Sequence, residues 1–502
     1  MSASTARRSI SSAQLTIDSS MPADMPGCPS EMPAKESLSF GKVFSPHMLR
    51  CRYAKEGGGW QSPEIVPFQD IALSPAASSL HYGMQCFEGM KAYKTLDDED
   101  DIRLFRPDMN MRRLKDSMTR LAMPGADFDP QELIDCIGKL VRLDKDWIPA
   151  GEGYSMYLRP TVVSTHPYLG LSCPDDLLLY VISGPVGPYY TTGFEPVRLT
   201  ADTEYVRAWP GGIGASKVGG NYAATMKPGA EANRAGYQQI LWLFGEDREV
   251  TEVGSMNVFF MLEREDGSGR ELVTPPLSRG DILPGVTRRS ILDLTQEWGE
   301  FDAVERSITM PEVRRAAHEG RLVEAFGAGT AAVVTPISCI RFEGEDIEVE
   351  ATGELTKRLF AHLTGIQYGK IKGPDGFEGA SKLITCWVKQ YNVAHLELAW
   401  FVTAPSAAPP SVPSAALPSS PPEITNRNGA ECGGKKAKAH DSSAPGTLKG
   451  RGGAEEETNP GRLPLSCRGD PTIGGTDMSP TRALPRRAEI KRSRRSRERE
   501  KR

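Results

Sequence analysis

The chain changes character near Gly373, and this change limits how much of its 502 residues can fold. From about Leu38 onward, apolar stretches alternate with polar and glycine-containing turns. After Gly373 the sequence includes "APSAAPPSVPSAALPSSPPE" and ends in "KRSRRSREREKR". Such segments bury too little apolar surface to offset the entropy lost on ordering. We therefore expect residues 38–372 to fold, residues 373–502 to form a mostly disordered basic tail, and residues 1–37 to form a disordered amino-terminal segment.

The arginine-dense end of the tail has two interpretations. It could be a nuclear signal or a nucleic-acid-binding tail, but most charge runs are only solvated. The whole chain has a formal net charge of -5, which gives no reason to expect nucleic acid or an anionic membrane as a partner. No apolar run reaches the ~20 residues that a transmembrane helix needs. We expect neither a nucleic-acid nor a membrane partner for the folded part.

The cysteines and the amino terminus bear on the compartment. The nine cysteines are scattered, and no two share a CxxC spacing. This argues against a structural zinc site or a disulfide framework and indicates a reducing compartment, so we expect no metal. The start, "MSASTARRSISSAQL", carries arginines and serines but no acidic residue, which weakly resembles a transit peptide; an ordinary disordered terminus explains it equally well. Cytoplasmic and mitochondrial locations both stay open.

Helix and strand signals alternate through the folded part. Proline near the start and glycine or proline after the end predict helices in "RPDMNMRRLKDSMTRLAMP", "LPGVTRRSILDLTQEWG" and "MPEVRRAAHEG". Strands are predicted in "DLLLYVISG", "VRLTADT" and "RLVEAFGAGTAAVVTPISCI", and a hairpin in "YQQILWLF", "GEDRE" and "VTEVGSMNVFFML". We predict an α/β (α+β) fold with a smaller domain at 38–195, a connection at 196–205 and a larger domain at 206–372, with a ligand cleft between the domains.

A glycine-rich stretch, "GGIGASKVGGNYAAT" at residues 211–225, surrounds Lys217. A P-loop is excluded because Ser216 precedes the lysine and Val218 follows it. A dinucleotide-binding fingerprint is excluded because the lysine stands where the third glycine belongs. Two interpretations remain. The stretch is either a solvent-exposed loop, or it holds a lysine for chemistry on carbonyls, for which pyridoxal phosphate is the common partner.

Pyridoxal phosphate needs an anion seat, an acid against its ring nitrogen and a donor near its phenolic oxygen. The helix predicted in "LPGVTRRSILDLTQEWG" offers an anion seat at its start. The free backbone amides of Val286 and Thr287 and the positive end of the helix dipole lie there. Glu252 could keep the pyridine nitrogen protonated, and Tyr222 could reach the phenolic oxygen. Each has an ordinary alternative, because Glu252 could be an exposed strand carboxylate and Tyr222 could simply pack.

Several motifs between about Leu38 and Tyr368 together resemble the branched-chain amino acid aminotransferases, a family of fold type IV pyridoxal phosphate enzymes. They occur in order and cover about two-thirds of the chain: "LHYGMQCFEGMKAYK", "RLFRPDMNMRRL", "SMYLRPTV", "GASKVGGNYAAT", "VTEVGSMNVFFML", "LVTPPL", "ILPGVTRRSIL" and "FGAGTAAVVTPI". So many ordered motifs leave little room for coincidence. The resemblance implies the two-domain fold type IV architecture, with the cofactor at the domain interface.

The resemblance implies pyridoxal 5′-phosphate as the cofactor and assigns residues to it. Lys217 matches the lysine that bonds covalently to the cofactor and moves a proton between the substrate Cα and the cofactor C4′. Glu252 matches the acid on the pyridine nitrogen, and Tyr222 matches the phenol beside the phenolic oxygen. Five further residues are assigned to the phosphate or to other contacts with the cofactor: Arg113, Ser255, Val286, Thr287 and Thr330.

The implied reaction is a reversible ping-pong transfer of the amino group between leucine, isoleucine or valine and 2-oxoglutarate. One pocket must then hold an alkyl chain in one half-reaction and a carboxylate in the other. Arg159 and tyrosine hydroxyls match the groups that meet the glutamate side chain; without the resemblance, a buried salt bridge would be the ordinary interpretation of Arg159. The backbone amides of Thr330 and Ala331 are expected to receive the substrate α-carboxylate. The apolar surface is assigned to Phe40, Tyr82, Phe87, Tyr157 and Tyr189.

In the family some pocket residues come from the partner subunit, and Tyr82 and Leu171 match them, so a homodimer is implied. Two features depart from the family. A CxxC redox switch of some animal members is replaced by Ala332 and Thr335, so we expect no thiol regulation there. The carboxyl terminus continues for over a hundred residues past the usual end of the family.

Two other functions are compatible with parts of this sequence. The same fold could act as a D-amino acid aminotransferase or a pyridoxal-dependent lyase, but "YLRP", "FEGMKAYK" and "FGAGTA" favour the branched-chain transaminase. A catalytically idle binding protein that recruits partners through its basic tail is the other alternative. The joint presence of Lys217, Glu252, Tyr222 and Arg113 speaks against it.

Overall fold

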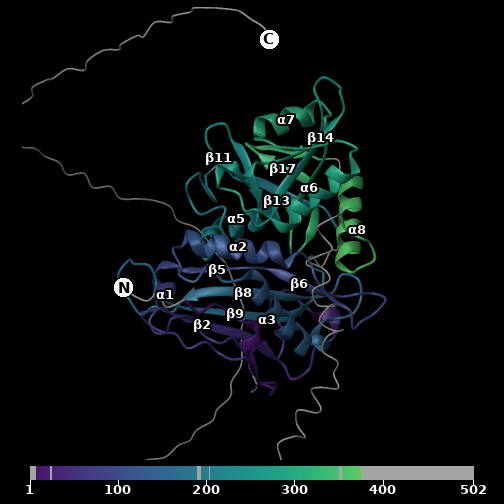
Figure 1. Ribbon diagram of the computed structural model, residues 1–502. Coiled ribbons are helices and arrows are strands. Elements are labelled where there is room, and N and C mark those ends of the chain that lie inside the picture. The colour runs from purple at the N-terminus through teal and green to yellow at the C-terminus, as the bar shows by residue number, and fades with distance from the viewer. Residues whose placement is uncertain (1–6, 23–24, 189–193, 203, 350–352, 375–502) are drawn as a thin grey trace, which may run out of the picture. The chain divides into compact units, whose positions relative to one another are not determined.

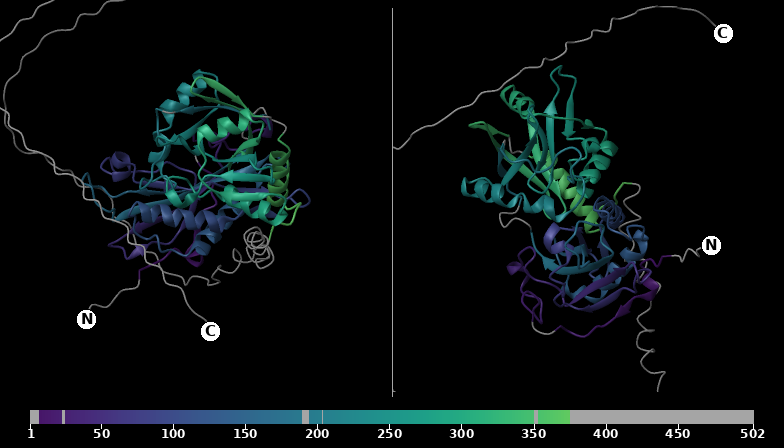
Figure 2. Two further views of the ribbon diagram at one scale, coloured as in Figure 1. Left: turned by 90° about the horizontal axis from the view of Figure 1, so that it is seen from above. Right: turned by 90° about the vertical axis from the view of Figure 1, so that its left-hand side faces the viewer.

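Two mixed β-sheets carry the part of the chain that the computed structural model describes, which is residues 7–22, 25–188, 194–202, 204–349 and 353–374 (Figure 1). The predicted disordered tail lies almost entirely outside these residues, and Tyr189 lies outside them too. The first sheet uses residues before 187 and the second uses residues after 196, which Figure 2 shows as a purple-to-blue half and a teal-to-green half. This arrangement agrees with the predicted α/β (α+β) class. The split into separate domains at 38–195 and 206–372 stays a prediction.

The first sheet has nine strands in the order β1-β4-β2-β9-β8-β6-β7, with β3 on β2 and β5 on β8. All its pairings are antiparallel except that of β1 with β4. Its strands are β1 (Thr16–Ile17), β2 (His47–Ala54), β3 (Gly59–Trp60), β4 (Glu64–Pro67), β5 (Gln85–Phe87), β6 (Met90–Lys94), β7 (Ile102–Leu104), β8 (Ser155–Ser164) and β9 (Asp176–Val186).

Helices α2 (Pro107–Arg120) and α3 (Pro130–Leu143) pack with this sheet around a core that includes Trp60 and Phe128. Both helices begin with proline, whose fixed φ suits the first turn. The helix predicted from "RPDMNMRRLKDSMTRLAMP" is therefore confirmed as α2. Figure 1 shows α2 on the side of the first sheet that faces the second. The short elements in this half are α1 (Ser78–Tyr82), η1 (Ser12–Gln14), η2 (Lys35–Ser37) and η3 (Lys145–Trp147).

The amino-terminal segment differs from the prediction of disorder over residues 1–37. Within its described part, β1 pairs with β4, and the Arg8 backbone N–H donates to the Gly58 carbonyl at 2.8 Å. The side chain of Ile10 is buried in the first core. The prediction was wrong for residues 7–22 and 25–37, because composition alone does not show that a neighbouring strand edge offers unpaired backbone groups to such a segment.

The second sheet has nine strands in the order β12-β11-β10-β17-β16-β13-β14-β15, with β18 on β17. Residues 197–202, expected within the interdomain connection, instead form β10, which pairs in parallel with both β11 and β17. Its strands are β10 (Val197–Asp202), β11 (Gln239–Phe244), β12 (Glu249–Val253), β13 (Asn257–Glu263), β14 (Arg270–Thr274), β15 (Asp302–Glu305), β16 (Leu322–Gly329), β17 (Val333–Phe342) and β18 (Glu345–Glu348).

The predicted helices of this half are confirmed as α6 (Val286–Trp298) and α7 (Met310–His318). Gly299 ends α6 in the left-handed region with φ 61°, and the Thr309 side chain accepts a hydrogen bond from the Glu312 backbone N–H at the start of α7. The other elements are α4 (Gly219–Ala223), α5 (Met226–Arg234), η4 (Leu277–Arg279) and α8 (Glu354–Gln367).

The predicted hairpin is confirmed in its first part, because β11 and β12 pair antiparallel. The second predicted strand is broken after Val253, and its continuation, β13, pairs with β14 and β16 instead. At the break the chain makes a tight turn, in which Met256 forms an isolated antiparallel bridge with Val253. Among the described residues, the cysteines form no disulfide, and no helix is long and apolar enough to cross a membrane.

Candidate active site

A cavity of about 140 Å³ lies where the glycine-rich stretch meets strands of both sheets. Of the residues predicted to bind cofactor or substrate, nine line it: Phe40, Phe87, Tyr157, Arg159, Lys217, Tyr222, Ser255, Thr330 and Ala331. The rest of the lining consists of Gly89, Gln239, Met256, Gly329 and Ala332. The lining residues run from Phe40 to Ala332, so the fold brings together side chains that lie up to 292 positions apart in the sequence (40 to 332).

Lys217 is fixed by its backbone as well as by its amine. Its backbone N–H donates to Ser117 Oγ at 2.9 Å, and its carbonyl accepts from the Phe87 N–H at 3.0 Å. Its Nζ donates to Tyr222 Oη at 2.9 Å and lies 5.0 Å from the centroid of the Phe87 ring. The solvent-exposed-loop interpretation is therefore wrong, and the alternative that Tyr222 only packs is wrong too.

The glycines around Lys217 include one that close packing requires. A Cβ on Gly214 would lie 2.4 Å from the carbonyl oxygen of Asp281. Only glycine allows the two backbones to approach so closely. This contact docks the lysine-bearing stretch on the residues just before α6, and so it sets the direction from which Lys217 enters the cavity.

The opposite wall of the cavity combines aromatic rings with a guanidinium. Arg159 Cζ lies 4.8 Å from the centroid of Phe87 and 5.2 Å from that of Tyr157, and its Nη2 donates to Tyr157 Oη at 3.2 Å. Phe40 meets Tyr157 edge to face, with the centroids 4.8 Å apart. A Cβ on Gly89 would lie 2.0 Å from Tyr157 Oη, so glycine is needed for this tyrosine to take its place.

The ordinary interpretation of Arg159, a buried salt bridge, is wrong. Within the described part of the chain Arg159 forms no ion pair, and its buried Nε has no hydrogen-bond partner. A half-buried guanidinium without a carboxylate is suited to bind one from a ligand, because its donors form a planar fork.

The turn between β16 and β17 forms a third wall. Gly329, Thr330, Ala331 and Ala332 all line the cavity, between strands that pair antiparallel. The Ala331 carbonyl accepts a hydrogen bond from Lys91 Nζ at 2.8 Å. This contact ties the turn of the second sheet to β6 of the first.

Glu252 is buried behind this cavity, so the exposed-carboxylate alternative is wrong: its side chain is only 2% exposed. Its Oε1 accepts from Asn257 Nδ2 at 3.0 Å and from the Leu283 N–H at 3.2 Å. Burial raises the pKa of Glu252, and the ion pair with Arg207 opposes that rise. The Oε2 atom is the one that meets Arg207 Nη1 in this ion pair.

Arg113, from α2, is also buried and does not line the cavity. Its Nε and Nη2 donate to the two carboxylate oxygens of Glu88, each at 2.8 Å, and its Nη1 donates to the Pro284 carbonyl at 2.9 Å. Pro284 lies two residues before the predicted phosphate seat at Val286 and Thr287, which begin α6 and are buried. Because Gly285 has no capping side chain, the first amides of α6 are not capped from there. The assignment of Arg113 and both amides to phosphate stays a prediction.

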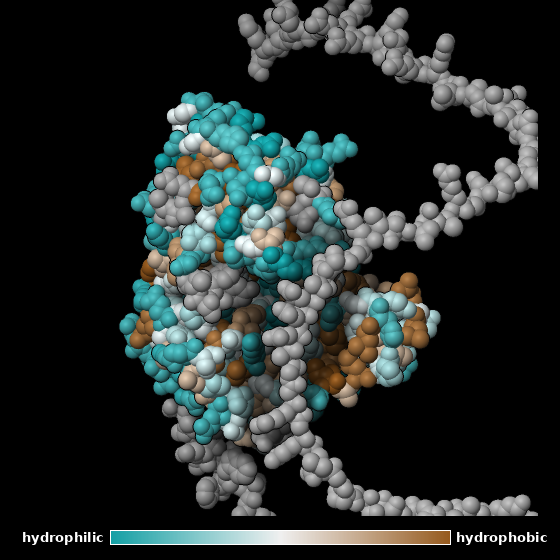
Figure 3. All heavy atoms as spheres, turned by 180° about the vertical axis from the view of Figure 1, so that it is seen from behind, coloured by the Kyte–Doolittle hydropathy of each residue, from teal (hydrophilic) through white to brown (hydrophobic). Residues whose placement is uncertain are grey.

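Tyr82 and Leu171 lie away from the cavity of their own chain. They are 43% and 86% exposed, and the Tyr82 hydroxyl donates to the Leu169 carbonyl. Leu80, Tyr168 and Leu169 are exposed as well, and Figure 3 shows apolar residues gathered on a part that projects from the molecule. Exposed apolar groups of this kind mark surfaces that bind a partner.

Sequence reasoning missed the buried polar residues that hold the predicted ones in place. Glu88 accepts from Asn110 Nδ2 at 2.8 Å in addition to its two bonds with Arg113. The sequence of α2 did indicate part of this arrangement, because Asn110 and Arg113 are three residues apart and therefore lie on the same face of the helix. Ser117 and Arg207 carried no local signal, because each meets its partner only through the fold.

The residues present fit pyridoxal phosphate. An amine and a phenol face one cavity, hydroxyl groups of Ser255 and Thr330 line it, and the carboxylate of Glu252 is buried behind it. A carboxylate accepts hydrogen bonds, so it is a group of the kind that holds a protonated ring nitrogen.

The chain is similar in sequence to known proteins. A family model described as Amino-transferase class IV matches residues 85–340. The chain is 52% identical over 348 residues to the branched-chain-amino-acid aminotransferase of Monosiga brevicollis, covering 68% of this chain and 87% of that protein. It is 50% identical to the cytosolic branched-chain-amino-acid aminotransferase of Saccharomyces cerevisiae, covering 66% and 89%. It is 48% identical to the mitochondrial one of Mus musculus, covering 68% and 86%.

Solved structures agree with these relatives. The branched-chain aminotransferase of Thermoproteus uzoniensis with norvaline matches with a TM-score of 0.52 and 26% identity, covering 63% of this chain and 95% of that one. The T.th. branched-chain amino acid aminotransferase with pyridoxamine 5′-phosphate matches with a TM-score of 0.51 and 25% identity, covering 66% and 97%.

Proposed function

This chain belongs to the class IV aminotransferases and, among them, to the branched-chain-amino-acid aminotransferases, and from this premise we propose that it transfers the amino group between leucine, isoleucine or valine and 2-oxoglutarate. The reaction is reversible and yields branched 2-oxo acids and glutamate. The observation that carries the proposal is a cavity where Lys217 faces aromatic walls and an arginine without a carboxylate partner. The relatives and the solved structures support the same reaction class.

The cofactor is pyridoxal 5′-phosphate, and when bound it supplies an electron sink for the negative charge that develops at the substrate Cα. Lys217 holds it covalently. The groups that we assign to its ring are Glu252, at the nitrogen, and Tyr222, at the phenolic oxygen. Those assigned to the phosphate or beside it are Arg113, Ser255, Val286, Thr287 and Thr330.

Lys217 also moves the proton. Its amine accepts the proton from the substrate Cα once the substrate has taken its place in the cavity. The hydrogen bond to Tyr222 Oη, at 2.9 Å, keeps the amine directed into the cavity. Glu88 and Asn110 keep Arg113 in position, and Asn257 keeps Glu252 in position.

The same walls suit both substrates of a ping-pong cycle. The rings of Phe40, Phe87 and Tyr157 pack on a branched alkyl chain. Arg159, beside Tyr157 Oη, binds the side-chain carboxylate of glutamate. The turn at Thr330 and Ala331 receives the α-carboxylate that both substrates share.

We also propose that the protein is a homodimer. Tyr82 and Leu171 are too exposed to complete the cavity of their own chain, and they belong to an exposed apolar patch. In a dimer these side chains would reach the partner's cavity and lose their contact with water. Light scattering of the purified protein measures this directly: a mass of one chain would overturn the proposal.

The decisive assay supplies the cofactor and measures glutamate formed from L-leucine and 2-oxoglutarate. We expect glutamate with leucine, isoleucine and valine, and little 2-oxo acid from D-alanine. Activity with D-alanine but not with L-leucine would point to the D-amino acid aminotransferase alternative. A protein that shows no visible absorbance of a lysine-bound cofactor after incubation would instead support the idle binding protein.

A further inference from the structure

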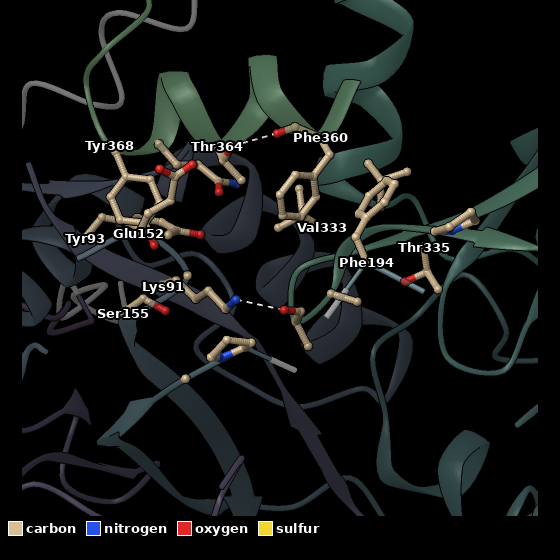
Figure 4. Close-up of a pocket in the computed structure, with 18 of the residues that line it drawn as sticks. Lys91, Tyr93, Glu152, Ser155, Phe194, Val333, Thr335, Phe360, Thr364 and Tyr368 are labelled. Carbon is tan, nitrogen blue, oxygen red and sulfur yellow. Dashed lines mark hydrogen bonds between the residues drawn. The ribbon is translucent and has the colours of Figure 1, made fainter. Parts of the chain in front are cut away.

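A second cavity, of about 280 Å³, lies on the other side of the turn between β16 and β17 (Figure 4). It shares Ala331 and Ala332 with the cavity around Lys217 but contains neither Lys217 nor Arg159. Its walls come from β6, β17, α8 and the segments around residues 152–155, 187–188 and 194–195. Nothing in the proposed transamination uses it.

This cavity holds buried polar atoms that lack partners. Thr335 and Gln367 are 2% and 5% exposed, and Thr335 Oγ1 and Gln367 Oε1 form no hydrogen bond with any described residue. Both residues line the cavity. Buried polar side chains in proteins are almost always hydrogen-bonded to protein, water or ligand, so Thr335 Oγ1 and Gln367 Oε1 each need a partner inside the cavity, and for the amide oxygen that partner must be a donor.

One buried cation also faces the cavity. Lys91 is 8% exposed, and its Nζ donates to the Ala331 carbonyl at 2.8 Å (Figure 4). An ammonium carries three donors, so this bond leaves two for a ligand. Burial lowers the pKa of Lys91 to about 8, and an anion in the cavity would favour the charged form.

The remaining walls select the body of the ligand. Phe194, Val333 and Phe360 line the cavity with apolar surface. Glu152 and Glu195 also line it, and their carboxylates disfavour a second negative charge. A small molecule with one carboxylate and an apolar body suits Lys91 and the apolar walls, whereas a dicarboxylate does not.

We propose that this cavity is a second binding site for small apolar monocarboxylates, in which the carboxylate binds Lys91 Nζ, the apolar body packs on Phe194, Val333 and Phe360, and water completes Thr335 Oγ1 and Gln367 Oε1. Branched-chain 2-oxo acids belong to this class. Occupancy acts on the first cavity through Ala331, whose carbonyl accepts from Lys91 and whose amide is assigned to the substrate α-carboxylate. This coupling rests on the proposed function, but the binding itself does not.

The test counts binding sites on the cofactor-loaded enzyme with 4-methylvalerate, a branched monocarboxylate that has no amino group to transfer. Total binding is measured by calorimetry, and occupancy of the first cavity is followed by the visible absorbance of the lysine-bound cofactor. We expect two equivalents per chain, only one of which changes the absorbance. A single equivalent, accounted for by the absorbance change, would overturn the proposal.

Variants then locate the second equivalent. Thr364 lines the second cavity from α8, and Thr364→Phe should fill the space and remove the equivalent that leaves the absorbance unchanged. His362→Phe is the matched control, because it places the same ring on the same helix at a residue that packs on Trp298 instead. Loss of the equivalent in both variants, or in neither, would contradict the assignment.

A gentler variant keeps the test valid if Thr364→Phe does not fold. Lys91→Met removes the ammonium and keeps an unbranched side chain, so it should weaken the second equivalent at least tenfold. Unchanged affinity would overturn the proposed contact with Lys91. If the protein shows no transaminase activity but Thr364→Phe still removes one of two equivalents, then the second site stands and the proposed function fails.

Discussion

Two lysines lie on opposite sides of the turn between β16 and β17, and their surroundings differ in kind. Lys217 enters a cavity walled by aromatic rings and donates to a phenol, Tyr222 Oη. Lys91 is buried, and its Nζ donates to a backbone carbonyl, that of Ala331. The comparison teaches that burial does not make a lysine catalytic. A reactive lysine needs space for a substrate in front of its amine and a neighbour that directs the amine there.

The largest expected effect is a difference in transaminase activity between variants of the two lysines. Lys217→Ala removes both the covalent hold on the cofactor and the proton-moving amine, so turnover of leucine should fall by several orders of magnitude. Lys91→Met removes only a contact to the turn, and its loss of turnover should be far smaller. Steady-state assays of both variants, with circular dichroism to confirm folding, check this ordering. Near-normal turnover in Lys217→Ala would rule out its assignment.

The second-largest expected effect follows from replacing Glu252, the buried carboxylate behind Lys217. Glu252→Gln leaves Arg207 buried without its ionic partner, which costs about 3–5 kcal/mol of stability where such a pair is broken on one side. It also replaces the acid assigned to the ring nitrogen, and turnover should fall ~100-fold or more. Urea unfolding and turnover of the loaded enzyme measure the two losses. Arg207→Met alone serves as the control, because it breaks the pair but keeps the acid; equal turnover losses in both variants would show that Glu252 acts only through the pair.

A smaller effect concerns substrate choice in the first cavity. Arg159→Met removes the guanidinium but keeps an apolar side chain, so single-turnover rates with glutamate should fall ~10–100-fold while those with leucine change by less than about threefold. The Phe40→Leu variant is a useful control, because it alters an apolar wall without touching the charge. Equal losses for both substrates in Arg159→Met would show that Arg159 serves only to support the rings.

The smallest effect is a pH dependence confined to the second cavity. Because the pKa of Lys91 is lowered to about 8, its amine loses the positive charge as the pH rises through that value. A carboxylate binds the ammonium but not the neutral amine, so the affinity for 4-methylvalerate at this site should fall roughly tenfold between about pH 7 and pH 9.

The other titratable groups in the lining are Glu152, Glu195, Tyr93 and Tyr368, and burial raises the pKa of both tyrosines. Calorimetry on Lys91→Met, which should bind weakly at either pH, is the control; a pH-independent affinity in the wild type would contradict the role of Lys91.

The sequence predicted some parts of this molecule well because their signals are local. Proline stands in the first turn of α2 and α7, glycine ends α6, and the "GEDRE" turn joins β11 to β12. The motif resemblance also placed nine residues around one cavity. By contrast, the predicted disorder failed for residues 7–22 and 25–37 and the predicted connection failed for residues 197–202, since a strand forms where its neighbours offer backbone partners and a short segment does not reveal those neighbours.

By itself, the sequence determined the helices with clear ends, because residue type and short-range spacing set them, and its ordered motifs indicated the reaction class and the role of Lys217 through their resemblance to a family. Only the tertiary structure decided which charges are paired. It joined Arg113 to Glu88 and left Arg159 without a carboxylate. It also brought Lys91 to Ala331 across 240 residues and enclosed a second cavity there. Such pairings depend on how the strands of the two sheets are arranged relative to each other in space. The residue pattern along the chain does not show this arrangement.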